Sequence, residues 1–375
     1  MTTNHNSTQD VAAPTEQFNF AQFLLERNAD RPAFIDDHDT LNYGDLSKRV
    51  CSMAAGLRSL GLKREERVLL LMHDCNDWPV SFLGAIYAGL VPVAVNTLLN
   101  AEDYAFILEN SRAQAVLVSG ALLPTLTAAM TKSDNEVSKV IVSKPAAPLL
   151  PTEAAFETFL QAHQPMAKAA TTKADDPGFW LYSSGSTGRP KGTVHSHANP
   201  YWTSMLYGKY LLQLTEHDVC FSAAKLFFAY GLGNGLTFPM AVGACTILMA
   251  ERPTPDATFK RMKGGVGGVK PTVFFGAPTG FAGMLAHPNL PSKTDVAIRL
   301  VSSAGEALPA DLGKRFTQHF GVNIVDGIGS TEMLHIYLSN KPDDVRYGTT
   351  GWAVPGYEIE LRGDDGNAVP DGEPG

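Results

Sequence analysis

The sequence predicts an α/β protein with a largely parallel sheet, and two observations carry this prediction. Short apolar runs of the buried-strand type alternate with segments whose apolar residues recur every three or four positions. Such alternation is typical of βαβ units with right-handed crossovers. The chain has 375 residues, 44% of them hydrophobic and 18% charged, so it is long enough for one large α/β unit or two lobes.

The first half of the chain shows the alternation most clearly. Apolar residues from Leu46 to Leu60 fall at spacings of four and three, and Gly61 closes this predicted helix. The uncharged stretch 78–95 is short for a membrane span and is broken by glycine and proline, so we expect a helix ending at Gly89 and then a strand. Further expected elements are strands at 67–72, 91–95, 114–119 and 139–143. A helix with acidic residues in its first turn is expected at 101–111.

The second half repeats the pattern after a connection. Residues 145–176 are rich in Ala, Pro and Thr and are expected to be irregular. The turn-rich end 363–375 predicts no terminal helix or strand. Between them we expect strands at 178–184, 243–249, 272–278, 298–305 and 322–329 and a helix at 308–320.

Composition argues against several classes of protein. The formal charge is -8 and the pI about 5.7, which argues against nucleic acid as the main partner, because phosphate binding needs a basic face. The four cysteines are far apart and form no CxxC pair, so neither disulfides nor structural zinc are expected. The polar N-terminus has no apolar signal core and predicts a disordered tail. We therefore expect a cytoplasmic protein without a membrane partner.

The stretch YSSGSTGRPKGTVHSH (182–197) cannot build a core. Gly185, Gly188 and Gly192 permit positive φ and close approach of a ligand. Successive backbone N–H groups in such a loop can converge on an anion, and the ammonium group of Lys191 adds a point charge. We interpret the stretch as a cradle for polyphosphate. Its hydroxyl donors are Ser183, Ser184, Ser186 and Thr187.

Other nucleotide and metal motifs fail on spacing. A P-loop needs Gly-Lys-Ser/Thr five residues after its first glycine, where this sequence has Pro190. The glycine clusters at 231–236 and 264–269 both lack the third glycine of a dinucleotide fingerprint. His195 and His197 have no third zinc-type ligand near them in sequence, so solvated or hydrogen-bonded histidines are expected.

The loop YSSGSTGRPKG resembles the signature phosphate loop of the adenylate-forming superfamily, which contains acyl-CoA synthetases, luciferases and peptide-synthetase adenylation domains. SSAGEALP (302–309), DGIGSTEM (326–333) and GTTGWAVPGYEIELRGDDGNAVPDGEPG (348–375) resemble further motifs of that superfamily in the expected order. RPAFIDD, VPVAVNTLL, KLFFAYGLGNG and STEMLHIYLSN resemble benzoate-CoA ligases, and together the matches cover most of the chain.

The resemblance implies the large N-terminal domain of the adenylate-forming fold, with two mixed, mainly parallel sheets flanked by helices and a smaller β-barrel-like part. We expect a disordered tail at 1–17, a first α/β subdomain at 18–170, a second at 171–345 with the nucleotide and acyl site, and a β-rich end at 346–375. The family's small C-terminal domain, which supplies a lysine for adenylation, is expected to be absent, so slow adenylation and little thioester are expected.

The resemblance also implies the reaction. A carboxylate attacks the α-phosphate of ATP to form an acyl-adenylate, and the thiol of coenzyme A then displaces AMP. ATP, Mg²⁺ and coenzyme A are therefore expected for an acid-thiol ligase that takes a small aryl carboxylate. A homodimer stays open.

Individual residues take roles from the same resemblance. Lys191, Thr187 and Glu332 are the expected catalytic residues, with Glu332 as the Mg²⁺ ligand and Thr331 at the α-phosphate. Ile328 stands where the family usually has an aromatic residue on adenine, and it offers an aliphatic face instead. The expected ATP-binding residues are Ser183, Ser184, Gly185, Ser186, Thr187, Gly188, Lys191, Ser303, Ala304, Gly305, Glu306, Ala307, Asp326, Gly327, Ile328, Gly329, Ser330 and Thr331.

The stretch LFFAYGLGNG (226–235) indicates the size of the substrate. Phe227, Phe228 and Tyr230 offer aromatic walls, and small residues beside them leave a slot for a flat ring. No aspartate is present there to pair with a substrate amine, which argues against an amino acid. The expected aryl-binding residues are Phe228, Ala229, Tyr230, Gly231, Ala304, Gly329, Leu334, His335 and Ile336.

Two other functions stay open at this point. A ligase for hydroxy- or aminobenzoate, or for another carboxylic acid, fits the same motifs, because His335 offers a hydrogen bond to a ring substituent. A nucleotide-binding module without catalysis is the alternative from another class. The intact Lys191 and Glu332 favour the enzyme.

Overall fold

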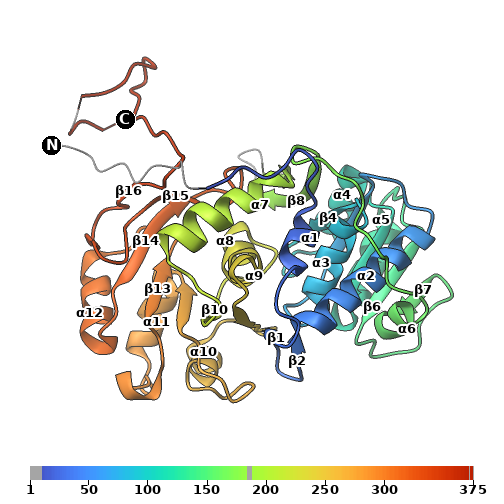
Figure 1. Ribbon diagram of the computed structural model, residues 1–375, viewed down its shortest axis with the longest axis horizontal. Coiled ribbons are helices and arrows are strands. Elements are labelled where there is room, and N and C mark those ends of the chain that lie inside the picture. The colour runs from blue at the N-terminus through green and yellow to red at the C-terminus, as the bar shows by residue number, and fades with distance from the viewer. Residues whose placement is uncertain (1–10, 184–187, 371, 375) are drawn as a thin grey trace.

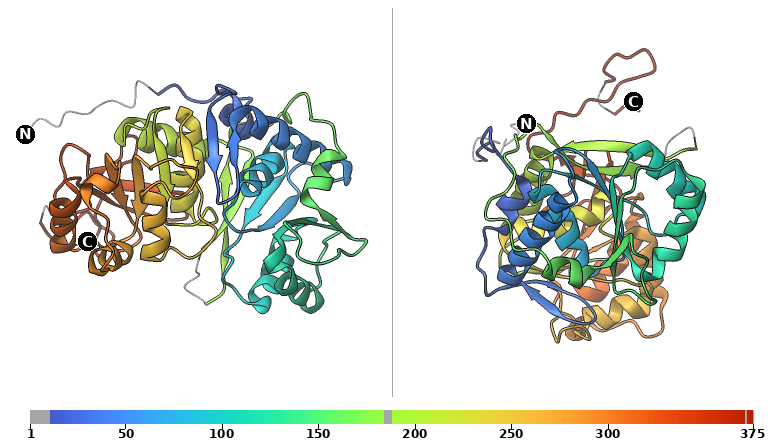
Figure 2. Two further views of the ribbon diagram at one scale, coloured as in Figure 1. Left: turned by 90° about the horizontal axis from the view of Figure 1, so that it is seen from below. Right: turned by 90° about the vertical axis from the view of Figure 1, so that its right-hand side faces the viewer.

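The computed structural model describes residues 11–183, 188–370 and 372–374. Two sheets flanked by helices lie side by side, a seven-stranded one built mainly from the first half of the chain and a nine-stranded one built mainly from the second (Figure 1). Figure 2 shows the same two halves from below and from one end. The predicted α/β fold with two mixed, mainly parallel sheets is confirmed.

The seven-stranded sheet has the order β7-β6-β5-β3-β4-β8-β9, and all its pairs are parallel except β8 with β9. Its strands are β3 (Arg67–Leu71), β4 (Val91–Ala94), β5 (Ala115–Ser119), β6 (Lys139–Ser143), β7 (Glu153–Ala155), β8 (Pro177–Ser183) and β9 (Lys191–Ser196). The helices in this half are α2 (Tyr43–Ser59), α3 (Asp77–Tyr87), α4 (Ala101–Ser111), η2 (Gly120–Leu122), α5 (Leu123–Lys132) and α6 (Phe156–Gln161).

The nine-stranded sheet has the order β16-β15-β14-β13-β12-β10-β11-β1-β2, with a parallel centre and antiparallel edges. Its strands are β1 (Pro32–Ile35), β2 (Thr40–Asn42), β10 (Val219–Ser222), β11 (Cys245–Ile247), β12 (Val273–Gly276), β13 (Leu300–Ser303), β14 (Ile324–Gly329), β15 (Ile336–Ser339) and β16 (Trp352–Ala353). Its helices are α1 (Phe20–Leu25), α7 (Ala198–Thr203), η3 (Ser204–Leu211), α8 (Ala229–Leu232), η4 (Gly233–Thr237), α9 (Phe238–Val242), α10 (Pro255–Met262), α11 (Pro278–Ala286), η5 (Lys293–Asp295) and α12 (Ala310–Phe320).

Local signals explain where the helices begin and end. Gly61 and Gly89 follow α2 and α3 with φ of 82° and 75°, the left-handed conformation that glycine adopts at low cost. The side chain of Asn100 accepts hydrogen bonds from the first turn of α4 at 2.8 and 3.0 Å, so this helix has the limits that the sequence predicts.

The expectation of an irregular connection at 145–176 is wrong. β7 extends the sheet by pairing with β6, and α6 packs on α2 through Phe159. A Cβ on Gly56 would come within 2.4 Å of the Phe159 ring, so the missing side chain in α2 makes room for it. The apolar residues that hold α6 are too few to show a period among the surrounding Ala and Pro.

Both chain ends differ from expectation in the part that the structure describes. Residues 11–17 are not a disordered tail, because Gln17 pairs with Lys173 and the Tyr201 hydroxyl donates to the Ala12 carbonyl at 2.7 Å. The described residues of 346–375 form only the short β16 and one bridge, Arg362 with Ala368, rather than a β-rich or barrel-like part. That segment is rich in Gly, Asp and Pro and has few apolar residues to bury against a second layer.

Strands from both sides of residue 171 enter each sheet. β1 and β2 join the later strands β10 and β11, while β8 and β9 close the sheet of the first half. The expected limit between two subdomains is therefore not a limit between the sheets, and the two halves of the chain are interleaved.

The cysteines and the uncharged stretch 78–95 lie within the folded core. All four cysteines are buried and free, which agrees with the expectation that they form no disulfide. The stretch 78–95 forms most of α3 and the strand β4. Among the helices of the described ranges, none is long and apolar enough to cross a membrane.

Candidate active site

The predicted site residues gather at the carboxyl ends of parallel strands, where ligands bind in open α/β sheets. Ser183 ends β8, Ser303 ends β13 and Gly329 ends β14. The loops 304–307 and 330–334 follow directly. These strands belong to different sheets, so the site lies where the two sheets meet.

Two hydrogen bonds join the sheets at this place. The Ser183 hydroxyl donates to the Glu332 carboxylate at 3.1 Å. The Nε2–H of His195 donates to the Thr331 carbonyl at 2.9 Å, and the Asn199 amide donates to His195 Nδ1 at 3.2 Å. Burial lowers the pKa of His195 to about 4, so the ring is neutral and both of its nitrogens are satisfied. His195 therefore joins Thr331 to Asn199 through hydrogen bonds. This agrees with the expectation of a hydrogen-bonded histidine.

The candidate phosphate loop is described only in part. Ser184, Gly185, Ser186 and Thr187 lie outside the described residues. Gly188 has φ of 84°, which agrees with the positive φ expected of this loop. Lys191 is exposed and stands opposite Ser183 in the antiparallel β8–β9 pair. The loop therefore connects two strands whose facing ends carry a hydroxyl and an ammonium group.

Glu332 has the chemistry of a magnesium ligand. Its carboxylate accepts from its own backbone N–H and from Ser183, and these hydrogen bonds hold its pKa below the usual range although burial opposes them. Glu332 is exposed, and the described residues contain no group of three His, Cys, Asp or Glu that could hold a metal alone. Mg²⁺ in proteins commonly binds one or two carboxylates together with substrate phosphates and water, so one carboxylate fits.

The expected adenine side consists of two neighbouring strand ends. Ser303 and Asp326 are register partners on β13 and β14, and burial raises the pKa of Asp326 to about 6. Neither Ser303 Oγ nor Asp326 Oδ1 has a hydrogen-bond partner with good geometry. Ile328 is 43% exposed, so its aliphatic face is available to a flat ring. Gly305, Glu306 and Ala307 are exposed, whereas Ala304 and Gly327 are buried.

A cavity of about 890 Å³ lies beside this region. Phe228 and Tyr230 line it, and Phe227 does so as well. The other predicted aryl-binding residues are outside its lining. These are Ala229, Gly231, Ala304, Gly329, Leu334, His335 and Ile336.

His335 packs directly behind Tyr230. Its Nε2–H donates to the Tyr230 carbonyl at 3.3 Å, and its ring lies 4.5 to 5.4 Å from those of Tyr207, Tyr230 and Phe238. Burial lowers the pKa of His335 to about 3, so the ring is neutral. Its Nδ1 has no partner in the described part of the chain and is a free acceptor.

Two predicted glycines are needed for close backbone packing. A Cβ on Gly231 would come within 2.0 Å of the Lys225 carbonyl oxygen, and one on Gly329 within 2.4 Å of the His335 carbonyl oxygen. Leu334 has φ of 68°, a strained conformation for a leucine and one that clusters at functional sites. The segment 329–335 is therefore tightly constrained between Tyr230 and the β8–β9 pair.

Several lining residues were not anticipated from the sequence. His73, Thr97 and Leu98 come from the ends of β3 and β4, and Lys225 and Ala250–Pro253 follow strands of the other sheet. All of them except Lys225 stand just beyond the carboxyl end of a predicted strand, and Lys225 follows β10, which was not predicted. That position is the signal that would have found them.

The fold and these strand-end motifs define an enzyme of the adenylate-forming class. The chain belongs to the AMP-binding enzyme family, whose model matches residues 21–375. It is an adenylating enzyme similar to benzoate-CoA ligases, within the acid-CoA ligases, and ATP and coenzyme A are the substrates that this family implies.

Three relatives illustrate the similarity. A benzoate-CoA ligase of Thauera aromatica is 46% identical over 372 residues, which are 98% of this chain and 69% of that protein. A 4-hydroxybenzoate-CoA/benzoate-CoA ligase of Rhodopseudomonas palustris is 41% identical, covering 96% of this chain and 67% of that protein. The crystal structure of a benzoate CoA ligase from Burkholderia xenovorans LB400 superposes with a TM-score of 0.88 and 56% identity, covering 95% of this chain and 70% of that chain.

Proposed function

We propose that this protein activates benzoate, or a closely related aryl carboxylate, with ATP and transfers the acyl group to coenzyme A. The observation that supports this proposal most is the placement of segment 329–335. On one side Glu332 meets Ser183 beside the phosphate loop, and on the other His335 meets the carbonyl of Tyr230 in the aromatic wall. One constrained segment thus links a polyphosphate seat to a ring-binding wall.

The first step brings a carboxylate to a triphosphate, so catalysis depends on neutralising charge and fixing geometry. Lys191 and the loop amides hold the β- and γ-phosphates, and Thr331 donates to the α-phosphate. Glu332 would hold Mg²⁺, which when bound supplies positive charge to the phosphates. The aryl ring lies against Tyr230 and directs its carboxylate to the α-phosphorus, which releases pyrophosphate.

The second step needs room for a thiol beside the adenylate. The cavity of about 890 Å³ is at the upper end of the range of small-molecule sites, and only Phe228 and Tyr230 of the predicted ring-binding residues line it. We assign the rest of this cavity to the arm of coenzyme A. Its lining comes from both sheets and is mostly apolar, with Lys225 and Arg252 as cations.

A ligase for hydroxy- or aminobenzoate is the second candidate, and one observation favours it. The neutral, buried His335 keeps Nδ1 without a partner among the described residues. A ring hydroxyl or amino group donating to that nitrogen would satisfy it, whereas unsubstituted benzoate would not.

Acid-dependent exchange of pyrophosphate into ATP tests the proposal. The full-length gene product is assayed with benzoate, 2-aminobenzoate, 3- and 4-hydroxybenzoate and straight-chain acids from hexanoate to palmitate. We expect the largest kcat/KM with benzoate or one of its substituted forms. Faster exchange with the straight-chain acids would contradict the aryl assignment, and no exchange with any acid would favour the non-catalytic module.

A further inference from the structure

One wall of the cavity has no regular secondary structure. It runs from Leu248 to Thr254, between the end of β11 and the start of α10, and we call it the 248–254 wall. Ala250, Glu251, Arg252 and Pro253 of this wall line the cavity. Two backbone hydrogen bonds hold its ends, from the Leu248 amide to the Ile35 carbonyl and from the Thr254 amide to the Arg252 carbonyl, both at 2.8 Å. Because no helix or sheet ladder supports the residues between them, side chains from elsewhere must hold those residues.

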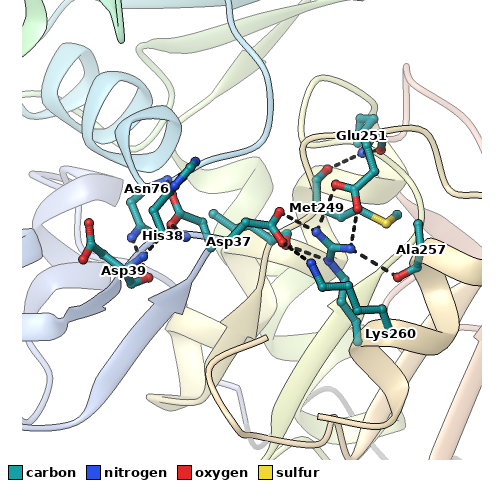
Figure 3. Close-up of polar contacts among 12 residues, drawn as sticks. Asp37, His38, Asp39, Asn76, Met249, Glu251, Ala257 and Lys260 are labelled. Atoms are coloured by element: carbon teal, nitrogen blue, oxygen red, sulfur yellow. Dashed lines mark hydrogen bonds and ion pairs between the residues drawn. The ribbon is translucent and has the colours of Figure 1, made fainter. Parts of the chain in front are cut away.

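A buried arginine lies behind this wall. Arg261 in α10 is 0% exposed, and its guanidinium donates to the Glu251 carboxylate at 2.7 and 3.0 Å. It also donates to the Leu248 carbonyl at 3.1 Å and to the Asp37 carboxylate at 2.6 Å. Figure 3 shows Asp37 and Glu251 approaching this group from two different segments. Arg261 thus ties Leu248 and Glu251 of this wall to α10 and to the β1–β2 turn.

A second cation holds the same wall from the cavity side. The Lys225 ammonium donates to the carbonyls of Met249 and, at 2.6 Å, Glu251. Behind it the buried carboxylate of Asp74 accepts from the Leu226 amide at 3.2 Å. Two side chains therefore replace the backbone hydrogen bonds that a regular element would give these carbonyl groups.

The geometry of this wall decides where one free cation stands. Arg252 is exposed and lines the cavity, and its guanidinium makes no ion pair or hydrogen bond with the described residues. It directly follows Glu251, which both Arg261 and Lys225 hold. Any loosening of the wall would therefore move a guanidinium group that is suited to bind phosphate.

We propose that Arg261 is a positioning residue for coenzyme A, which acts by holding the 248–254 wall so that Arg252 meets a phosphate of the incoming thiol substrate. This inference rests on the proposed function, which places the arm of coenzyme A in the cavity. It concerns the second step alone. None of the described residues expected to bind ATP lines the cavity, so we expect the loss of Arg261 to affect adenylation much less than thioester formation.

Arg261→Met in the full-length gene product tests the inference, because methionine fills much of the space without the hydrogen bonds. We expect the KM for coenzyme A in thioester formation to rise about 10-fold, since small displacements far from the chemistry have effects of that order or larger. Benzoate-dependent pyrophosphate exchange should stay within about twofold of the unaltered protein. Arg261→Lys keeps the charge and should restore part of the loss.

Two further variants keep the result interpretable. Arg299→Met breaks a bidentate ion pair with the buried Asp218, with distances of 2.6 and 2.7 Å. This pair lies at the amino ends of β10 and β13, whereas the cavity lies beyond their carboxyl ends. It should lower stability and leave the KM for coenzyme A unchanged. Asp37→Asn removes one partner of Arg261 from a surface turn, so it should fold even if Arg261→Met does not, and it should raise that KM by about twofold to threefold.

Three results would overturn the inference. One is an unchanged KM for coenzyme A in both Arg261→Met and Asp37→Asn. Another is a loss of pyrophosphate exchange as large as the loss of thioester formation, which would mean a general structural role. The third is an equal rise in KM for Arg299→Met. Absence of exchange in the unaltered protein would instead refute the proposed function, so the two failures are distinguishable.

Discussion

Charged residues beside the phosphate loop differ in what surrounds them. Lys191 is exposed and faces Ser183 across the β8–β9 pair, whereas the Arg189 guanidinium stacks 5.2 Å from the centre of the Phe106 ring. The first is free to meet a ligand and the second is already held by the protein. This contrast provides a matched pair for testing the phosphate site.

Lys191→Ala should lower the rate of pyrophosphate exchange by about 100-fold and raise the KM for ATP, because one preorganised charge on the phosphates is lost. Arg189→Ala should change both quantities by less than about threefold, since its guanidinium packs on a ring. Steady-state exchange kinetics over a range of ATP concentrations measure the effect. Unchanged ATP affinity in Lys191→Ala combined with Thr187→Ala would refute the phosphate cradle.

A second prediction at this scale concerns pH. Burial lowers the pKa of His197 to about 4, and its Nδ1 accepts from the Phe20 amide at 3.2 Å. In the unfolded chain this histidine takes up a proton near pH 6.5, whereas in the folded protein it stays neutral down to about pH 4. His197 therefore lowers the free energy of unfolding as the pH falls from 6.5 to 4.

His197→Asn should therefore be less stable than the unaltered protein at pH 7.5, by about 1 to 3 kcal/mol. The difference should shrink by about 1.4 kcal/mol per pH unit below pH 6.5. Denaturant unfolding at several pH values measures it. His217→Asn, which changes a side chain that is 79% exposed, serves as control. A difference that is constant from pH 7.5 to 4.5 would contradict the argument.

Sequence reasoning at the residue scale found the motif residues but not their contacts. The spacing of Gly, Ser and Lys after a strand is a local signal, so the loop and Glu332 could be named. The bond from Ser183 to Glu332 joins residues 149 positions apart, and nothing in either local pattern specifies it. Arg261 was missed for the same reason, because one arginine in an amphipathic helix usually faces water.

Elements near the site depend on how closely backbones approach. Gly231 in α8 faces the Lys225 carbonyl, with no room for a Cβ. Gly280 in α11 has nothing within 4 Å of the place that a Cβ would occupy. Glycine at the first position is a packing requirement, and at the second it costs helix stability.

Gly231→Ala should therefore destabilise the protein by about 2 kcal/mol or more, because a main-chain carbonyl must move. Gly280→Ala should stabilise it by about 0.5 kcal/mol, because alanine has the higher helix propensity. Thermal and denaturant unfolding of both variants measure the pair. The same sign of change in both would contradict the assignment of the two glycines.

Whole elements could be predicted where their pattern was strong. α4, with acidic residues in its first turn and a period of three to four, has the limits that were expected. β7 and α6 were missed, because a three-residue edge strand and a six-residue helix are stabilised by β6 and α2 and not by their own sequence. Short elements of this kind follow from tertiary packing.

At the scale of the whole molecule, the interleaving of the chain is what the sequence could not reveal. The order of strands and helices predicts parallel pairing, yet it does not say that β1 and β2 cross into the sheet of the second half. The expectation of two sheets came from the resemblance to the adenylate-forming superfamily. The crossing follows from contacts such as the parallel pairing of β1 with β11, between residues about 210 positions apart.

The candidate site spans both sheets, so occupancy should stabilise them together. Ser183 and His195 belong to the seven-stranded sheet and meet Glu332 and Thr331 next to β14 of the other. A non-hydrolysable benzoyl-adenylate analogue at 100 times its Kd should therefore raise the free energy of unfolding by about 2.7 kcal/mol. Amide hydrogen exchange in β5 and in β12 reports on the two halves separately, and exchange that requires global unfolding should slow by about 100-fold in both.

The same nucleoside carrying hexanoate in place of benzoate is the control, and it should protect less at equal concentration. Protection confined to one sheet would mean that the analogue binds within a single half, and that the bridge between Ser183 and Glu332 does not form part of the site.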